Sequence, residues 1–168
     1  KSDRTLYRLI RRQKVARIVE LGVGDGQRAA RMIALAGWSH PADQVRYAGV
    51  DLFEGRPAGA PPGITLKEAH RRLSPTKAKI YLAPGDPYSA LSRLANSLPA
   101  TDLVVISRDI DAESLAQAWF FVPRMLHAQS IVLKEAIDPK NGAAVFVEIP
   151  RATIDARASA AQRSRRAA

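Results

Sequence analysis

A glycine-rich stretch directly after a short apolar run constrains the fold of this chain more than any other feature. The apolar run 15–21 leads into Gly22, Gly24 and Gly26, and a helix-like segment, Gln27–Ala36, follows immediately. Glycines allow positive φ angles and a close approach to a ligand, and the start of a helix offers unpaired N–H groups. Strand, glycine turn and helix together predict a nucleotide-binding turn. The alternative is a glycine-rich turn that binds no ligand.

The spacing of the glycines separates two kinds of nucleotide-binding turn. The dinucleotide fingerprint needs the spacing G-x-G-x-x-G. Residues 22–27 read GVGDGQ, so the third glycine comes one residue early and Gln27 stands where the fingerprint needs glycine. This spacing disfavours an NAD-dependent oxidoreductase.

With the acid Glu20, the stretch resembles the E/D-x-G-x-G-x-G loop of the class I S-adenosylmethionine-dependent methyltransferases. In that family the loop wraps the methionine part of the cofactor, and the acid helps to hold its amino group. The resemblance implies that the chain binds S-adenosylmethionine and yields S-adenosylhomocysteine as product. The loop residues that it assigns to the cofactor are Glu20, Gly22, Gly24, Asp25 and Gly26.

A second acid follows the next predicted strand, Val45–Asp51. In doubly wound sheets, ligands bind at the carboxyl ends of the strands. Asp51 therefore falls where a carboxylate can accept hydrogen bonds from two ribose hydroxyls, and the resemblance implies that Leu52 packs on the adenine. The alternative for Asp51 is an ordinary turn residue at the end of a strand.

The turn after the third predicted strand, Ala78–Ala83, contains Asp86 and Pro87. The resemblance implies that Asp86 accepts a hydrogen bond from the adenine amino group, with Pro87 as an apolar neighbour of the base. A Pro-Gly-Asp-Pro turn also forms without any ligand, and this alternative stays open.

The end of the fourth predicted strand bears on catalysis. Some small members of the superfamily carry I-D-G-D-H-x-Y-E there, and residues 106–113 of this chain read ISRDIDAE. Ser107 and Ile110 replace the acid and the histidine that serve such proteins as a metal ligand or proton-handling group. The resemblance places Ser107 in the cofactor site and leaves the catalytic residues unassigned. The three histidines are far apart in the sequence and predict no metal site.

The remaining pattern predicts a Rossmann-like, doubly wound α/β sheet that is mostly parallel, with helices on both faces. Right-handed crossovers lead to the strand order 3-2-1-4-5. Asn141-Gly142 between two apolar runs is a hairpin signal, so a last strand, Ala143–Ile149, should lie antiparallel beside the fifth. Pro123 predicts a kink or break in the helix expected over residues 113–126.

The 168 residues predict one domain. We expect residues 1–150 to form a methyltransferase-like domain that begins with a covering amphipathic helix, Ser2–Lys14. Residues 151–168 form a basic Ala/Arg-rich tail, expected as a helix or as a loosely held arm. The Pro- and Gly-rich segment 55–63 predicts a loop near the ligand edge.

A net charge of +10 makes nucleic acid a candidate partner. The arginines concentrate at the two ends of the chain, which would make one continuous basic face if both ends folded onto the same side. The alternative is that an Arg- and Ala-rich composition only forms a solvated surface. The absence of cysteine fits a cytoplasmic protein, and no apolar run has membrane-spanning length.

Two functions from different classes follow. The first is a small S-adenosylmethionine-dependent methyltransferase whose acceptor the sequence does not identify. The alternative is a non-catalytic methyltransferase-like domain that binds S-adenosylmethionine or nucleic acid, which Ser107 and Ile110 favour.

Overall fold

One mixed sheet organises the computed structural model, which describes residues 3–59 and 63–167. Ser2 of the predicted first helix and residues 60–62 of the predicted loop lie outside these ranges, as does Ala168 of the predicted tail. The strands are β1 (Arg17–Leu21), β2 (Arg46–Asp51), β3 (Lys79–Pro84), β4 (Thr101–Ile106), β5 (Leu126–Ile137) and β6 (Ala144–Glu148).

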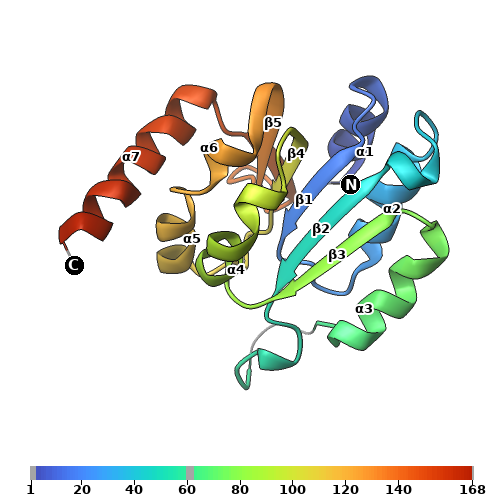
Figure 1. Ribbon diagram of the computed structural model, residues 1–168, viewed down its shortest axis with the longest axis horizontal. Coiled ribbons are helices and arrows are strands. Elements are labelled where there is room, and N and C mark those ends of the chain that lie inside the picture. The colour runs from blue at the N-terminus through green and yellow to red at the C-terminus, as the bar shows by residue number, and fades with distance from the viewer. Residues whose placement is uncertain (1–2, 60–62, 168) are drawn as a thin grey trace.

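The order of the six strands is β3-β2-β1-β4-β5-β6 (Figure 1). The first five are parallel, and β6 pairs antiparallel with β5. The predicted order and the predicted hairpin are thus confirmed. Gly142 has a φ of 68° in the hairpin turn. A hydrogen bond of 2.8 Å from the Asp138 N–H to the Ala143 carbonyl closes this turn.

Helices cover both faces of the sheet, as predicted. One face carries α1 (Asp3–Arg12), α2 (Gln27–Ala36) and α3 (Leu66–Leu73). The other face carries α4 (Pro87–Leu94), α5 (Ala112–Ala118), α6 (Val122–Met125) and α7 (Arg151–Ala167). Pro123 lies at the start of α6, and the expected helix over 113–126 is broken between α5 and α6.

Successive side chains of a strand point to opposite faces of the sheet, so the core has two layers. Val19, Val50 and Val104 face α4 and α5, whereas Ile18 and Val105 face α1 and α2. Strands covered on both faces are apolar almost throughout, as in other parallel sheets. Across the described residues, every helix is too short or too polar to cross a membrane.

The C-terminal segment forms helix α7, which packs on the domain. Ile154 and Ala161 are buried, and the guanidinium of Arg157 lies 4.9 Å from the centre of the Trp119 ring. Helix α1 packs on the opposite face, and the two helices lie far apart in Figure 1. The two basic ends therefore do not form one continuous face, because each helix buries its apolar residues against a different side of the sheet.

The packing of α7 can be tested with Ile154→Ala. We expect this change to lower the free energy of unfolding by about 2–4 kcal/mol, because it leaves a cavity beneath a buried side chain. Urea denaturation measures the change. Arg163→Ala, at an exposed position of the same helix, is the control and should change stability by less than about 0.5 kcal/mol. Equal, small effects of both changes would show that α7 is only loosely held.

Candidate functional site

The glycine loop lies at the carboxyl edge of the sheet, between the ends of β2 and β4. The Gly22 N–H donates to the Val50 carbonyl at 2.8 Å, and the Ser107 N–H donates to the Leu21 carbonyl at 2.8 Å. Gly22 has a φ of 92°, and a Cβ atom there would lie 2.6 Å from the Cβ of Ser107. Both the backbone angle at position 22 and the close approach of Ser107 therefore require glycine there.

The next two glycines also have positive φ angles, 62° at Gly24 and 75° at Gly26. A Cβ atom at Gly24 would meet nothing within 4 Å, whereas one at Gly26 would lie 2.8 Å from Ile64 Cδ1. Gly26 precedes the first turn of α2, where Asp25 accepts from the Gln27 N–H at 2.9 Å. Gly24 is thus the loop glycine at which an added Cβ atom would enter open space.

Asp51 ends β2 beside this loop, and its side chain is buried. Its Oδ2 accepts from the Gly24 N–H at 2.9 Å, and its Oδ1 accepts from the Phe53 N–H at 3.2 Å. Arg56 Nη2 lies 2.6 Å from each of the two carboxylate oxygens. Asp51 therefore joins the glycine loop to the segment after β2, and Arg56 covers the same oxygens.

Asp86 caps the N-terminus of α4. Its Oδ1 accepts from the Ser89 N–H at 3.1 Å and from Ser114 Oγ at 2.5 Å, and its Oδ2 accepts from Ser89 Oγ at 2.5 Å. Partial burial raises the pKa of Asp86, but the hydrogen bonds from Ser114 and Ser89 outweigh it and bring the pKa down to about 2. Asp86 is therefore a carboxylate at neutral pH, with acceptor capacity left on Oδ2.

Glu20 lies entirely inside the protein beneath the loop. Arg28 Nε donates to its Oε1 at 2.6 Å, and the Tyr47 hydroxyl donates to its Oε2. Burial raises the pKa of Glu20, and the neighbouring Arg28 guanidinium opposes that shift. Arg28 also donates to Glu135 Oε2 at 3.2 Å and to the Gly22 carbonyl at 3.0 Å. One guanidinium thus connects Glu20, the glycine loop and the end of β5.

Two hollows meet at the loop. The inner hollow, of about 110 Å³, includes Arg56 and Ile110 in its lining, and the outer hollow, of about 890 Å³, includes Arg28 and Glu135. Both hollows are bordered by Gly22, Gly24 and Ser107. The predicted residues that line the inner hollow are Gly22, Gly24, Asp51, Leu52, Asp86, Pro87 and Ser107.

The other three predicted residues lie elsewhere. Asp25 lines only the outer hollow, and neither hollow includes Glu20 or Gly26 in its lining. Glu20 is separated from solvent by its own partners, and Gly26 serves the turn into α2. No cluster of three or more metal-ligating side chains is present in residues 3–59 and 63–167.

Two charged residues of the site, Arg28 and Arg56, were not identified from the sequence. Arg28 stands in the first turn of a helix, and Arg56 stands in a Pro- and Gly-rich segment. Each is one of 26 basic residues, and no local pattern distinguishes it. The signal that could have found Arg28 is the need of a carboxylate at the end of a buried strand for a cationic partner.

Glycine is required in the loop for two reasons, a positive φ angle and a close neighbouring atom, and substitutions can separate them. Gly22→Ala should lower the free energy of unfolding by about 1–3 kcal/mol more than Gly24→Ala. Both changes strain a left-handed backbone, but only the first adds an overpacking clash. Thermal or urea unfolding of the two variants measures the difference. Equal losses would show that the contact with Ser107 relaxes at no cost.

Solved structures with a similar fold include S-adenosylmethionine-dependent methyltransferases. No family model matches the chain, and no curated protein matches its sequence. The O-methyltransferase TomG from Streptomyces achromogenes, solved with S-adenosylmethionine, superposes with a TM-score of 0.61 at 14% identity over 95% of this chain and 65% of that one.

An O-methyltransferase from Bacillus cereus, solved with S-adenosylhomocysteine, gives a TM-score of 0.61 at 12% identity over 98% of this chain and 68% of that one. A TehB-like methyltransferase from Corynebacterium glutamicum gives 0.53 at 17% identity, over 92% and 70%. The chain thus spans about two thirds of the length of these structures. At such identities the likeness establishes the fold, and this chain has the Rossmann-like fold of these methyltransferases.

Proposed function

We propose that the protein is an S-adenosylmethionine-dependent methyltransferase whose cofactor lies across the two hollows. The observation that carries the proposal is the contact of the glycine loop with Asp51, made at the carboxyl edge where β1, β2 and β4 end. Doubly wound sheets bind nucleotide-like ligands at this edge. The fold shared with methyltransferases solved with S-adenosylmethionine or its product supports the same choice.

The inner hollow suits the adenosine part of the cofactor. The Asp51 carboxylate supplies acceptors for two ribose hydroxyls, and Leu52, which is 39% exposed, is available for contact with the base. Asp86 lines the same hollow. Its Oδ2 can accept one more hydrogen bond, for example from an adenine amino group.

The outer hollow suits the methionine part. Its lining carries the Arg28 guanidinium and the Glu135 carboxylate, which complement the carboxylate and the ammonium group of an amino acid. Glu20, which the resemblance assigned to the amino group, is buried behind Arg28. In this proposal Glu20 positions Arg28, and Arg28 contacts the ligand.

Bound S-adenosylmethionine supplies a methyl group on a positively charged sulfur, a good leaving group. The protein's task is to align an acceptor with that methyl group. Gly22, Gly24 and Ser107 border both hollows and therefore lie where the two parts of the cofactor would meet.

One observation favours the second candidate function, a methyltransferase-like domain that binds the cofactor without catalysis. Ile110 lines the inner hollow after β4, where the small methyltransferases that the sequence resembles carry a histidine. Label from methyl-labelled S-adenosylmethionine should appear on small molecules or RNA of a cell extract if the protein is an enzyme. Cofactor binding without any such transfer would support the second candidate.

Cofactor binding can be measured by isothermal titration. We expect S-adenosylhomocysteine to bind and NAD not to bind. Asp51→Asn should weaken S-adenosylhomocysteine binding by about tenfold or more, because charge-assisted hydrogen bonds to the ribose are lost. Asp43→Asn, an exposed acid far from both hollows, is the matched control and should bind normally. Unchanged affinity in Asp51→Asn would refute the ribose assignment, and preferential NAD binding would refute the proposed function.

Arg56 competes with the ribose for Asp51, since its Nη2 already lies 2.6 Å from both oxygens. A ligand that uses this carboxylate must displace the guanidinium. Arg56→Ala should therefore tighten S-adenosylhomocysteine binding by about three- to tenfold. Arg71→Ala, an exposed arginine on α3, is the control. Weaker binding by Arg56→Ala would instead show that Arg56 contacts the bound ligand.

A further inference from the structure

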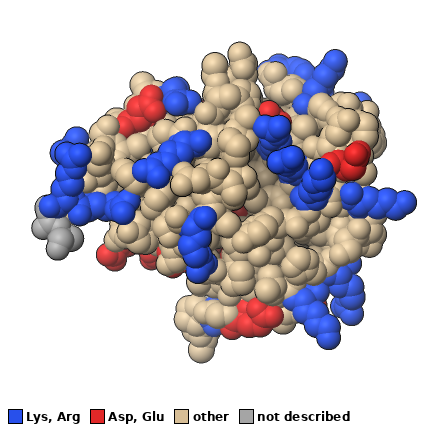
Figure 2. All heavy atoms as spheres, viewed as in Figure 1, with Lys and Arg blue, Asp and Glu red and all other residues tan. Residues whose placement is uncertain are grey.

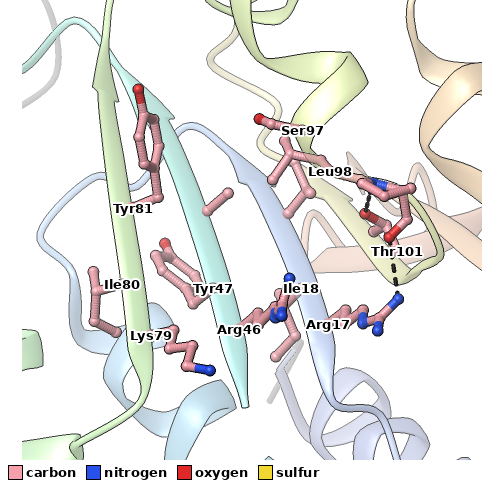
Figure 3. A pocket seen from close by; sticks show the side chains of 13 residues that line it. Arg17, Ile18, Arg46, Tyr47, Lys79, Ile80, Tyr81, Ser97, Leu98 and Thr101 are labelled. Carbon is pink, nitrogen blue, oxygen red and sulfur yellow. Dashed lines mark hydrogen bonds between the residues drawn. The ribbon is translucent and has the colours of Figure 1, made fainter. Parts of the chain in front are cut away.

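Another hollow lies at the opposite, amino ends of the strands, on the sheet face that also carries α4. It has a volume of about 460 Å³, within the range of small-molecule sites. Its floor is Val19 and Ala48 of the buried sheet, and Leu98 and Pro99 form one side. Tyr81 stands on the other side (Figure 3), and this residue is 52% exposed.

Three cations line the end of this hollow in one row. Arg17, Arg46 and Lys79 begin three adjacent strands, and the register places Arg17 opposite Arg46 and Arg46 opposite Lys79. Figure 3 shows the three side chains at the same end of β1, β2 and β3, and Figure 2 shows Lys and Arg gathered over this part of the viewed face. Adjacent strands lie about 4.8 Å apart, so the row is about 10 Å long.

Folding alone does not account for this row. Like charges directly opposite one another on neighbouring strands destabilise a sheet. Arg17 donates to the Pro99 carbonyl at 3.2 Å, and within residues 3–59 and 63–167 no carboxylate lies within 4 Å of the charged ends of the three side chains. In the described residues the three side chains therefore form no ion pair, although Asp102 accepts from the Arg17 backbone N–H at 2.8 Å, and their charged ends can contact an anionic ligand.

We propose that this hollow binds a nucleoside polyphosphate, with its phosphates on the row of Arg17, Arg46 and Lys79 and its base between Tyr81 and Leu98. Three cations within about 10 Å match a ligand with two or more negative charges, and arginine pairs well with phosphate oxygens. An exposed tyrosine ring beside apolar side chains offers a flat base a surface to stack on. A nucleoside polyphosphate combines these two chemical features.

This site lies at the other end of the strands from the proposed cofactor site, so the two proposals can fail separately. The probe is UTP, chosen because its base differs from adenine. Titrations are made on the full chain saturated with S-adenosylhomocysteine, at low and at high salt. We expect UTP to bind more tightly than UMP, uridine not to bind, and inorganic triphosphate to bind about tenfold more weakly than UTP, since it has no base to stack.

Variants locate the binding. Arg46→Ser should weaken UTP binding by about tenfold, through loss of a charge-assisted contact. Tyr81→Val keeps a strand-forming residue and should weaken UTP binding by about fivefold, without affecting inorganic triphosphate. Arg71→Ser, on the opposite face, removes the same charge and should leave binding unchanged. Each variant is first checked for normal thermal unfolding.

Several results would overturn the proposal. One is no detectable UTP binding, and another is an equal loss in Arg71→Ser, which would show a general charge effect. Equal affinity for UTP and inorganic triphosphate would leave no place for a base. Displacement of UTP by a single-stranded oligouridylate that binds at least about tenfold more tightly would assign the row to a nucleic-acid strand instead of a free nucleotide.

Discussion

The buried carboxylate of Glu20 imposes a condition that the site around it must satisfy. A charge without solvent contact is costly unless it is paired and hydrogen-bonded. Arg28 supplies the charge from the first turn of α2, and the Tyr47 hydroxyl supplies a second donor from β2. Because Arg28 also reaches Glu135 near the end of β5, one network joins the three strands β1, β2 and β5 to helix α2.

This network also shapes the glycine loop before any ligand arrives. Arg28 holds the carbonyl of Gly22, while Asp51 holds the N–H of Gly24. The loop is thus fixed at two of its glycines by side chains from different elements, and a preorganised loop costs a ligand little ordering. The Asp51 carboxylate is the exception, since Arg56 covers its oxygens and must move before they can accept from a ligand.

Much of this arrangement follows from local sequence, because crossover rules and apolar strands leave few topologies open. The strand order, the antiparallel last strand and the break at Pro123 were all predictable, and so was the place of Asp51 at the edge beside the loop. Contacts that depend on long-range geometry were not. Arg28 meets Glu135 across 107 positions of the chain, and no periodicity encodes that meeting.

The same limit applies to the ends of the chain. The sequence shows that α1 and α7 are basic, but not which face of the sheet each one covers. Helix α7 packs on α5 and α6 because Ile154 is buried there and because arginines of α7 lie over Trp119 and Phe120. Those arginines are therefore partly occupied within the fold. Charge counted along a sequence overstates the charge available to a partner.

Helix dipoles bear on the charges at the two ends of the strands. Helices that connect parallel strands run opposite to them, so their N-termini, with partial positive charge, lie at the carboxyl edge. Acids suit that edge, and Asp86 caps α4 there. Cations suit the amino edge, but a helix dipole acts only over about one turn. The dipole does not account for the alignment of Arg17, Arg46 and Lys79, which comes from the register of three strands. Arg46 and Lys79 are exposed, so water and salt weaken their repulsion, and the fold tolerates the row without gaining stability from it.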